Sequence, residues 1–237
     1  MVPDVSEDEG FALALSAVLA LLSAVRWYKP LLTVSLLGGG GLLRAVLFLT
    51  PPLGLAVLWW VLKTYAAPEV REGPEYVLLF ILAGAAWMGL AAAGMRVMDI
   101  SFRDDAIENR NPAAVAVTRG AVWGGMLCFA GANAGEGATI WTTFFPAAVS
   151  TGLLWFLWFV LACASRVSDA VTIDRDTASG LRLAGLLIAG GVVLGRAGPC
   201  CHTAPSGLLD ISFAIEHFPL FLPSFRPPAD ATIPARC

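Results

Sequence analysis

The sequence contains little charge. Of its 237 residues only 14% are charged and 57% are hydrophobic, and the formal net charge is −3. This composition excludes a soluble globular protein, and the scattered basic residues exclude the basic patch of a nucleic-acid-binding protein. The composition therefore predicts an integral membrane protein with the lipid bilayer as its partner and no nucleic acid.

Histidine is scarce as well. The chain has two histidines, His202 and His217, and both follow the last long apolar run. Haem is commonly held by a histidine, and a nucleophilic serine commonly needs a histidine base. We therefore expect neither a catalytic site nor a bound cofactor, and we interpret the chain as a protein that is not an enzyme.

The five cysteines lack the spacing of a metal site. Cys200 and Cys201 are adjacent, without the Cys-x-x-Cys of a zinc knuckle or the Cys-x-x-Cys-His of attached haem. If the C-terminal segment is outside the cytoplasm, a disulfide between Cys237 and Cys200 or Cys201 is preferred over a metal site that includes His202. The sequence therefore predicts no bound metal.

Long apolar runs are abundant. A helix needs ~20 apolar residues to cross a bilayer, and about six runs approach this length, at 11–25, 42–61, 76–95, 113–133, 144–165 and 178–194. Pro51 and Pro52 predict a kink in the second run, because proline lacks the amide hydrogen that a helix uses. The aromatic and basic cluster at 26–29 is typical of a membrane interface. Residues 31–41 are either a re-entrant segment or a turn.

Arginine and lysine accumulate in alternate loops. With six spans, the loops at 26–41, 96–112 and 166–177 contain most of the basic loop residues, and the opposite loops contain only Lys63 and Arg71. Short loops rich in Lys and Arg stay in the cytoplasm. This distribution predicts a multi-pass protein with both termini outside the cytoplasm.

One charged loop has a counterpart 65 positions later. Arg110 and Asn111 align with Arg175 and Asp176, and small residues follow in both copies. Each copy joins two apolar runs, so the repeated unit is a helix, a charged loop and a returning helix. We expect an all-α integral membrane protein of about six transmembrane helices, the last four forming a parallel pseudo-repeat of two helical hairpins.

The same pattern divides the chain into three parts. Residues 1–75 are expected to form an N-terminal transmembrane hairpin, and residues 76–196 a duplicated four-helix membrane domain. Residues 197–237 are expected to form an extracytoplasmic, Pro-rich tail with a short amphipathic helix. Phe218, Phe221 and Phe225 in this tail are too apolar to leave in water. They are expected to contact lipid, the ends of the chain's own helices, or a partner.

The segment DDAIENRNPAA at 104–114, followed by Gly120 and Gly124, resembles the signature of the YjfL-like family of bacterial inner-membrane domains of unknown function. The resemblance covers roughly 76–196. It implies a bacterial inner-membrane location and two helical hairpins, each with an acidic cytoplasmic loop that leads into a helix with spaced glycines. The family's second Asn is replaced here by Asp176. Because the family has no established role, the resemblance implies no activity.

Two arginines are candidates for a functional site. Arg119 and Arg182 lie about 7 residues inside their helices, or roughly 10 Å along the helix axis. Each either extends to the lipid headgroups or turns inward. Turned inward, they would form a polar cluster with Glu108, Asp174 and Asp176 that binds an anion or relays protons.

Other positions have structural interpretations. Asn111 and Asp176 each precede a helix and are expected to cap it. Small residues spaced four apart allow two helices to approach closely. On this basis, close helix packing is expected at Ala116, Gly120, Gly124 and Gly185.

Two functions are compatible with these features. The preferred one is a non-catalytic structural or accessory subunit of a larger membrane assembly, which associates with other membrane protein subunits or with itself. The alternative is a small transporter or channel with a polar path between the two repeats, because transporters are often built from repeats. The subunit is preferred because a path needs polar groups near the membrane centre, and these spans contain few.

Overall fold

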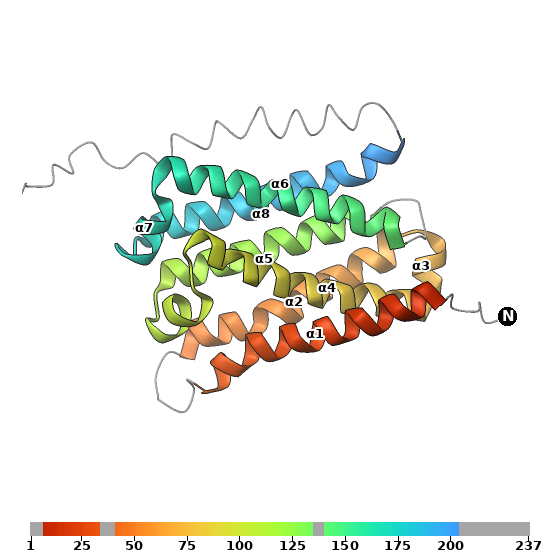
Figure 1. The fold of residues 1–237 in the computed structure, drawn as a ribbon, viewed down its shortest axis with the longest axis horizontal. Coiled ribbons are helices and arrows are strands. Elements are labelled where there is room, and N and C mark those ends of the chain that lie inside the picture. Colours follow the sequence, from red (N-terminus) through yellow and green to blue (C-terminus); the bar gives the residue numbers. More distant parts are fainter. Residues whose placement is uncertain (1–6, 34–40, 135–139, 204–237) are drawn as a thin grey trace, which may run out of the picture.

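The computed structural model describes residues 7–33, 41–134 and 140–203, which form a bundle of helices without any strand (Figure 1). The long helices are α1 (Glu7–Thr33), α2 (Gly41–Tyr65), α4 (Pro74–Gly94), α5 (Pro112–Ala132), α6 (Ile140–Ser165) and α8 (Thr177–Thr203). The short ones are α3 (Pro68–Glu72), α7 (Val167–Thr172), the 3-10 helix η2 (Met95–Met98) and the π-helix η3 (Phe102–Glu108).

Some predicted features lie outside the described residues. These are Cys237, Phe218, Phe221 and Phe225, most of the segment 31–41, and the side chains of Cys200 and Cys201. The predicted disulfide and the predicted tail contacts therefore stay predictions.

Six of the described helices are long and apolar enough to cross a membrane. This confirms the prediction of an all-α membrane protein with six spans. The first span is longer than predicted, since α1 continues to Thr33 instead of ending near Val25. The cluster at 26–29 is part of this helix, because long basic side chains can extend to the membrane surface without interrupting a helix.

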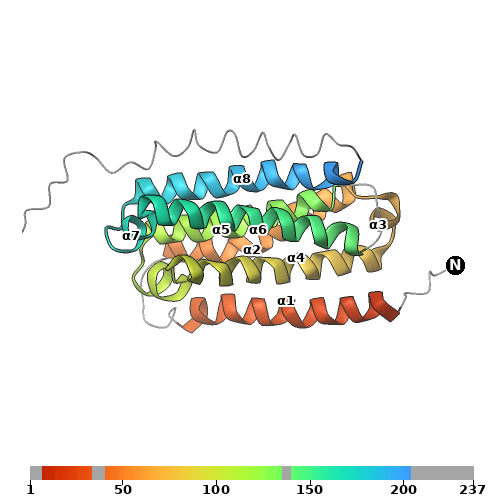
Figure 2. The same ribbon diagram turned by 45° about the horizontal axis from the view of Figure 1, so that its top comes forward.

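The long helices lie side by side and run alternately in opposite directions (Figures 1 and 2). The segment with η2 and η3 lies at the same end of the bundle as α7, and α3 lies at the opposite end (Figure 1). α5 is the central helix. Along its most apolar stretch 78% of the residues are buried, against 17–44% in the other five spans.

The first two helices do not form a separate hairpin. α1 packs mainly along α4, whereas α2 packs against α5 and α4 and has little contact with α1. A Cβ added to Gly89 would collide with the side chain of Ser23, so α1 and α4 touch at this point. The predicted N-terminal unit at 1–75 is therefore integrated into the bundle, because the small residues of α4 offer α1 a closer contact than α2 does.

The two charged turns have the same local conformation. Arg110 and Arg175, 65 positions apart, both adopt left-handed backbone angles, with φ of 50° and 53°. Backbone hydrogen bonds recur at the same spacing: Asn109 N to Asp104 O and Asp174 N to Asp169 O, and Asn111 N to Asp105 O and Asp176 N to Ala170 O. The sequence alignment of the two turns thus corresponds to a matched backbone geometry.

Candidate functional site

The predicted inward polar cluster is absent from the described residues. Arg119 on α5 and Arg182 on α8 are both exposed on the outside of the bundle. The neighbouring residues Gly120, Leu183 and Ala184 are buried, and Gly120 contacts Ala184 between α5 and α8. A helix turns by about 100° per residue, so placing the small residues inside directs the arginines outward.

The acidic members of the cluster are exposed too. Glu108 accepts a hydrogen bond from Nε of Arg103 at 2.8 Å, and this bond raises the pKa of Arg103. Asp174 is exposed in the turn before α8. Asp176 accepts hydrogen bonds from the hydroxyl and the backbone of Ser179, which lower its pKa. Glu108 and Asp176 thus form hydrogen bonds within the turns, and none of the three exposed carboxylates lines a buried path.

α5 and α8 are in close backbone contact along their length, and we call this contact surface the seam. A Cβ added to Gly120 would lie 2.5 Å from Cα of Ala184, and one added to Gly124 would lie 2.5 Å from the carbonyl oxygen of Leu187. Real Cβ atoms do not approach so closely. The same is true from the other side of the seam at Gly180, Gly191 and Gly195, which would meet Ala113, Gly124 and Leu127.

Two of the four predicted packing residues, Gly120 and Gly124, are therefore confirmed, and Ala116 is half-buried. Gly185 makes no such contact within the described chain: it is exposed, and a Cβ there would meet nothing within 4 Å. Its counterpart Gly120 faces the seam, but α8 presents Ala184 to Gly120 and turns Gly185 outward. The two helices thus use different faces in spite of the aligned sequences.

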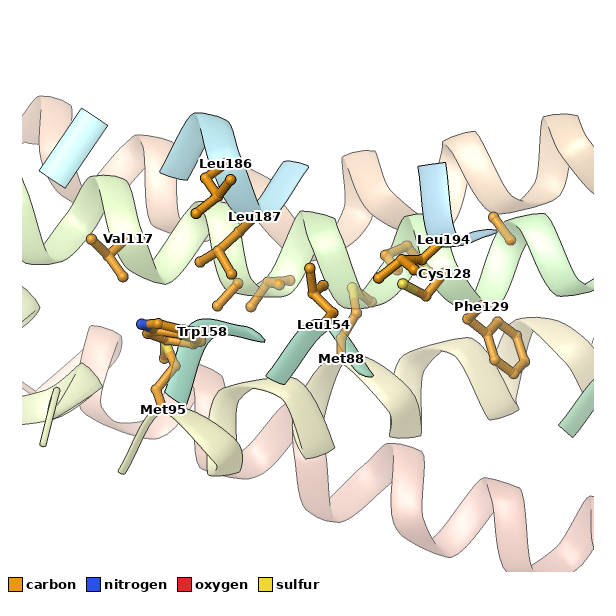
Figure 3. Packing of buried hydrophobic residues seen from close by; sticks show 14 of the residues in the cluster. Met88, Met95, Val117, Cys128, Phe129, Leu154, Trp158, Leu186, Leu187 and Leu194 are labelled. Atoms are coloured by element: carbon orange, nitrogen blue, oxygen red, sulfur yellow. The ribbon is translucent and has the colours of Figure 1, made fainter. Parts of the chain in front are cut away.

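The core around α5 is apolar. Leu154 and Trp158 of α6 and Leu187 and Leu194 of α8 are directed toward it (Figure 3). Among residues 10–33, 41–134 and 141–196 the buried polar side chains are all Ser, Thr or Asn, with no buried Asp, Glu, Lys or Arg. This part of the interior therefore has no titratable group of these types on which a proton or ion relay could depend.

Asn111 caps α5 and also ties it to α7. Its side-chain oxygen accepts from the backbone N–H groups of Ala113 and Ala114, and its amide donates to the carbonyl of Val171 at 2.6 Å. Asp176 caps α8 in the same way, through Ala178 and Ser179. Both predicted caps are confirmed.

The difference between the two caps has a physical reason. Asn111 is 1% exposed, so a charge there would be costly and an amide donor is required. Asp176 is exposed, where a carboxylate at a helix N-terminus is favourable.

A long apolar groove lies between α1, α2 and α4 and reaches the first residues of α6. Its volume is about 1170 Å³, above the roughly 300–1,000 Å³ typical of small-molecule sites. Exposed residues such as Leu22, Val25, Leu90 and Ala93 line it, so the groove opens on the outer surface of the bundle. We consider this groove the candidate functional site.

Two prolines shape one wall of the groove. A helical residue donates its N–H to the carbonyl four residues earlier, so Pro51 and Pro52 leave the carbonyls of Leu47 and Phe48 without a helical donor. Trp27 Nε1 of α1 donates to the carbonyl of Leu47 at 3.2 Å. The Tyr28 hydroxyl donates to the carbonyl of Phe48 at 3.4 Å. We call these two bonds the α1–α2 clamp.

The clamp gives a prediction about stability. Trp27→Phe should keep most of the ring packing but leave the buried Leu47 carbonyl without a donor, which costs about 1–3 kcal/mol. Pro51→Ala restores the helical N–H to that carbonyl, so Trp27→Phe should cost roughly 1 kcal/mol less in the Pro51→Ala background. The measurement is unfolding in mixed detergent followed by circular dichroism. Equal losses in both backgrounds would contradict the clamp, and Trp60→Phe, at an exposed position, is the control.

The sequence did not reveal the groove. The sequence pattern at 26–29 predicts an interface anchor, yet Trp27 is 6% exposed and its ring stacks on Phe102, with the ring centroids 4.2 Å apart. The proline pair predicts a kink, but it does not indicate which residues donate hydrogen bonds to the two carbonyls in place of the missing helical N–H groups. The sequence does contain a signal for these bonds. Two adjacent prolines in the second span leave two backbone carbonyls without helical donors, and two adjacent aromatic residues with N–H or O–H donors, Trp27 and Tyr28, lie near the end of the preceding span.

Comparison of the chain with protein-family models, with curated proteins and with solved structures finds no match.

Proposed function

We propose that this protein is a non-catalytic accessory subunit of a larger membrane assembly. The observation that carries the proposal is a set of small residues that are exposed on the outer surface of the described bundle. On α8 these are Gly185 and Ala189, and on α6 they are Ala148 and Gly152. Each pair has the four-residue spacing that lets a second helix approach closely.

The two glycines are informative because their surroundings are empty. A Cβ added to Gly152 or Gly185 would meet nothing within 4 Å, whereas those added to Gly120 and Gly124 would collide with α8. One chain thus uses small residues for internal contacts on α5 and presents further ones on its surface. Close helix packing is their common physical role, so a helix of another subunit, or of a second copy, is the expected partner.

The closed seam favours the subunit over a transporter. The two hairpins have their most extensive contact along α5 and α8, where close backbone contacts leave no space for solute. Arg119 and Arg182, which would line such a path, are exposed on the outside. Liposomes that contain the purified protein are expected to show equal solute flux with the wild type and with Arg119→Leu/Arg182→Leu.

The proposal is tested by gentle detergent extraction and native mass measurement. The wild type should carry a stoichiometric partner or a second copy, and Gly152→Leu/Gly185→Leu should lose it. The matched control is Gly10→Leu/Gly41→Leu, which places the same bulk at helical glycines whose Cβ would also meet nothing within 4 Å. A monodisperse particle of the wild-type chain alone would contradict the proposal.

We further propose that the protein lies in the bacterial inner membrane with both termini outside the cytoplasm. Excess Arg at the end of the bundle with η3 and α7 supports this orientation. In a variant without its natural cysteines, a cysteine at Glu108 or at Asp174 should react with an impermeant maleimide only after the membrane is opened. Reaction of either one in intact cells contradicts the orientation.

The matched turns at Arg110 and Arg175 support the proposal that the last four spans arose by duplication. Membership of the YjfL-like family stays a prediction that rests on the segment 104–114.

A further inference from the structure

One end of the groove between α1, α2 and α4 is basic. Four of the residues that line it are Arg26 and Lys29 of α1, Arg96 of η2 and Arg103 of η3. They come from three separate elements that meet at the same end of the bundle (Figure 1). No Asp or Glu is among the described residues that line the groove. The residues that line this end of the groove therefore carry positive charge only, although the chain as a whole has a net charge of −3.

All four basic side chains are exposed, so they are accessible to a ligand in the groove. Arg103 is bonded to Glu108, at the rim, through Nε alone. A guanidinium has five N–H donors, so the four N–H groups on the two terminal nitrogens of Arg103 can bind an anion. The Glu108 carboxylate meanwhile fixes the orientation of the guanidinium.

The rest of the groove is apolar and long. It extends along α1 from Lys29 to Phe11, which is roughly 27 Å at 1.5 Å per residue. This is most of the ~30 Å hydrocarbon thickness of a bilayer. Leu15, Leu19 and Leu22 line its α1 wall, and Ala85, Ala86 and Ala93 line its α4 wall. Large side chains face small ones along the groove, which leaves room for a chain-like apolar group.

From this charge distribution we propose that the groove binds an anionic phospholipid. The phosphate lies among Arg26, Lys29, Arg96 and Arg103, and the acyl chains lie between α1 and α4. The depth of the headgroup follows from the helix positions, since the basic residues lie at the membrane surface and the alanines lie within the hydrocarbon layer. Three aromatic side chains line the same end of the groove, those of Trp27, Tyr28 and Phe102. The α1–α2 clamp fixes the first two of them beside the proposed headgroup position.

The test compares lipid binding by three variants of the whole protein. Each is delipidated in mild detergent and titrated with phosphatidylglycerol or phosphatidylcholine, and bound lipid is counted by native mass measurement. Arg26→Gln/Lys29→Gln/Arg96→Gln/Arg103→Gln should bind phosphatidylglycerol at least ~10-fold more weakly than the wild type. The control Arg119→Gln/Arg166→Gln/Arg175→Gln/Arg182→Gln removes the same charge away from the groove and should bind as the wild type does.

The third variant separates the apolar part of the site from the charges. Ala93→Trp fills the groove at an exposed position and leaves all four basic residues in place. It should lower binding of both lipids, and the wild type should prefer phosphatidylglycerol. Equal binding by all variants means that the lipid is only part of the general annulus, and it overturns the proposal. Loss of a bound protein instead of a lipid from the glutamine variant overturns it too, because a partner helix would then occupy the groove.

Discussion

Gly120→Leu is expected to lower the free energy of unfolding by about 3 kcal/mol or more, at the upper end of the cost of overpacking a tight interface. At this position even a methyl group would lie 2.5 Å from Cα of Ala184 and 2.9 Å from its carbonyl oxygen. A backbone cannot move aside as a flexible side chain can, so α5 and α8 must separate. Unfolding by denaturing detergent, followed by circular dichroism, measures the loss.

The matched control for this change is at the aligned position 65 residues later. Gly185→Leu adds the same side chain to an exposed site with nothing within 4 Å, so the expected change for the isolated chain is within about 0.5 kcal/mol. Helix propensity changes equally in both variants and cancels in the comparison. If both variants have the same stability, the close seam between α5 and α8 is refuted.

Asn111→Ala is expected to cost roughly 1.5–5 kcal/mol. Loss of the cap that holds the N–H groups of Ala113 and Ala114 accounts for about 0.5–2 kcal/mol. The buried carbonyl of Val171, which accepts from the Asn111 amide at 2.6 Å, then lacks a donor, and this costs about 1–3 kcal/mol more. The same detergent unfolding experiment measures the effect.

Asn111→Asp distinguishes the two contributions. Aspartate keeps the cap but places an acceptor against the Val171 carbonyl and a charge at a buried position, so its loss should be at least as large as that of alanine. The reciprocal change Asp176→Asn keeps a good cap at an exposed position and should change stability little. Similar small effects of both exchanges would show that Asn111 acts only as a cap.

Local features of this chain could be predicted from its sequence. The six spans follow from the length of the apolar runs, and the caps at Asn111 and Asp176 follow from residue type and position alone. These features depend on residues close together in the chain. Neighbouring residues carry enough information to determine helix ends and membrane crossing.

Features that depend on helix rotation could not be predicted in this way. The four-residue spacing of Gly120 and Gly124 predicts a contact face, but it does not say that α8 would present Ala184 in place of Gly185. A rotation of about 100° per residue decides whether Arg182 points inward or outward. That rotation is determined by how several helices fit together at once. The alignment of the two repeated segments does not distinguish one face of the helix from the other.

The groove was missed because it joins residues that are far apart in sequence. Trp27 contacts Leu47 across 20 positions and stacks on Phe102 across 75. The neighbour of α1 is also α4, not the next helix along the chain. A hairpin of two consecutive spans would pair α1 with α2, whereas the groove depends on the packing of α1 against α4.

The central position of α5 has a consequence for how the protein is made. α5 has the lowest mean hydropathy of the six spans, yet the largest share of its surface is covered by other helices. A segment of this kind partitions weakly from the translocon into lipid by itself. We expect its insertion to require the α4 span to remain beside it, so that a chain interrupted within α4 leaves α5 outside the bilayer and exposed to membrane proteases.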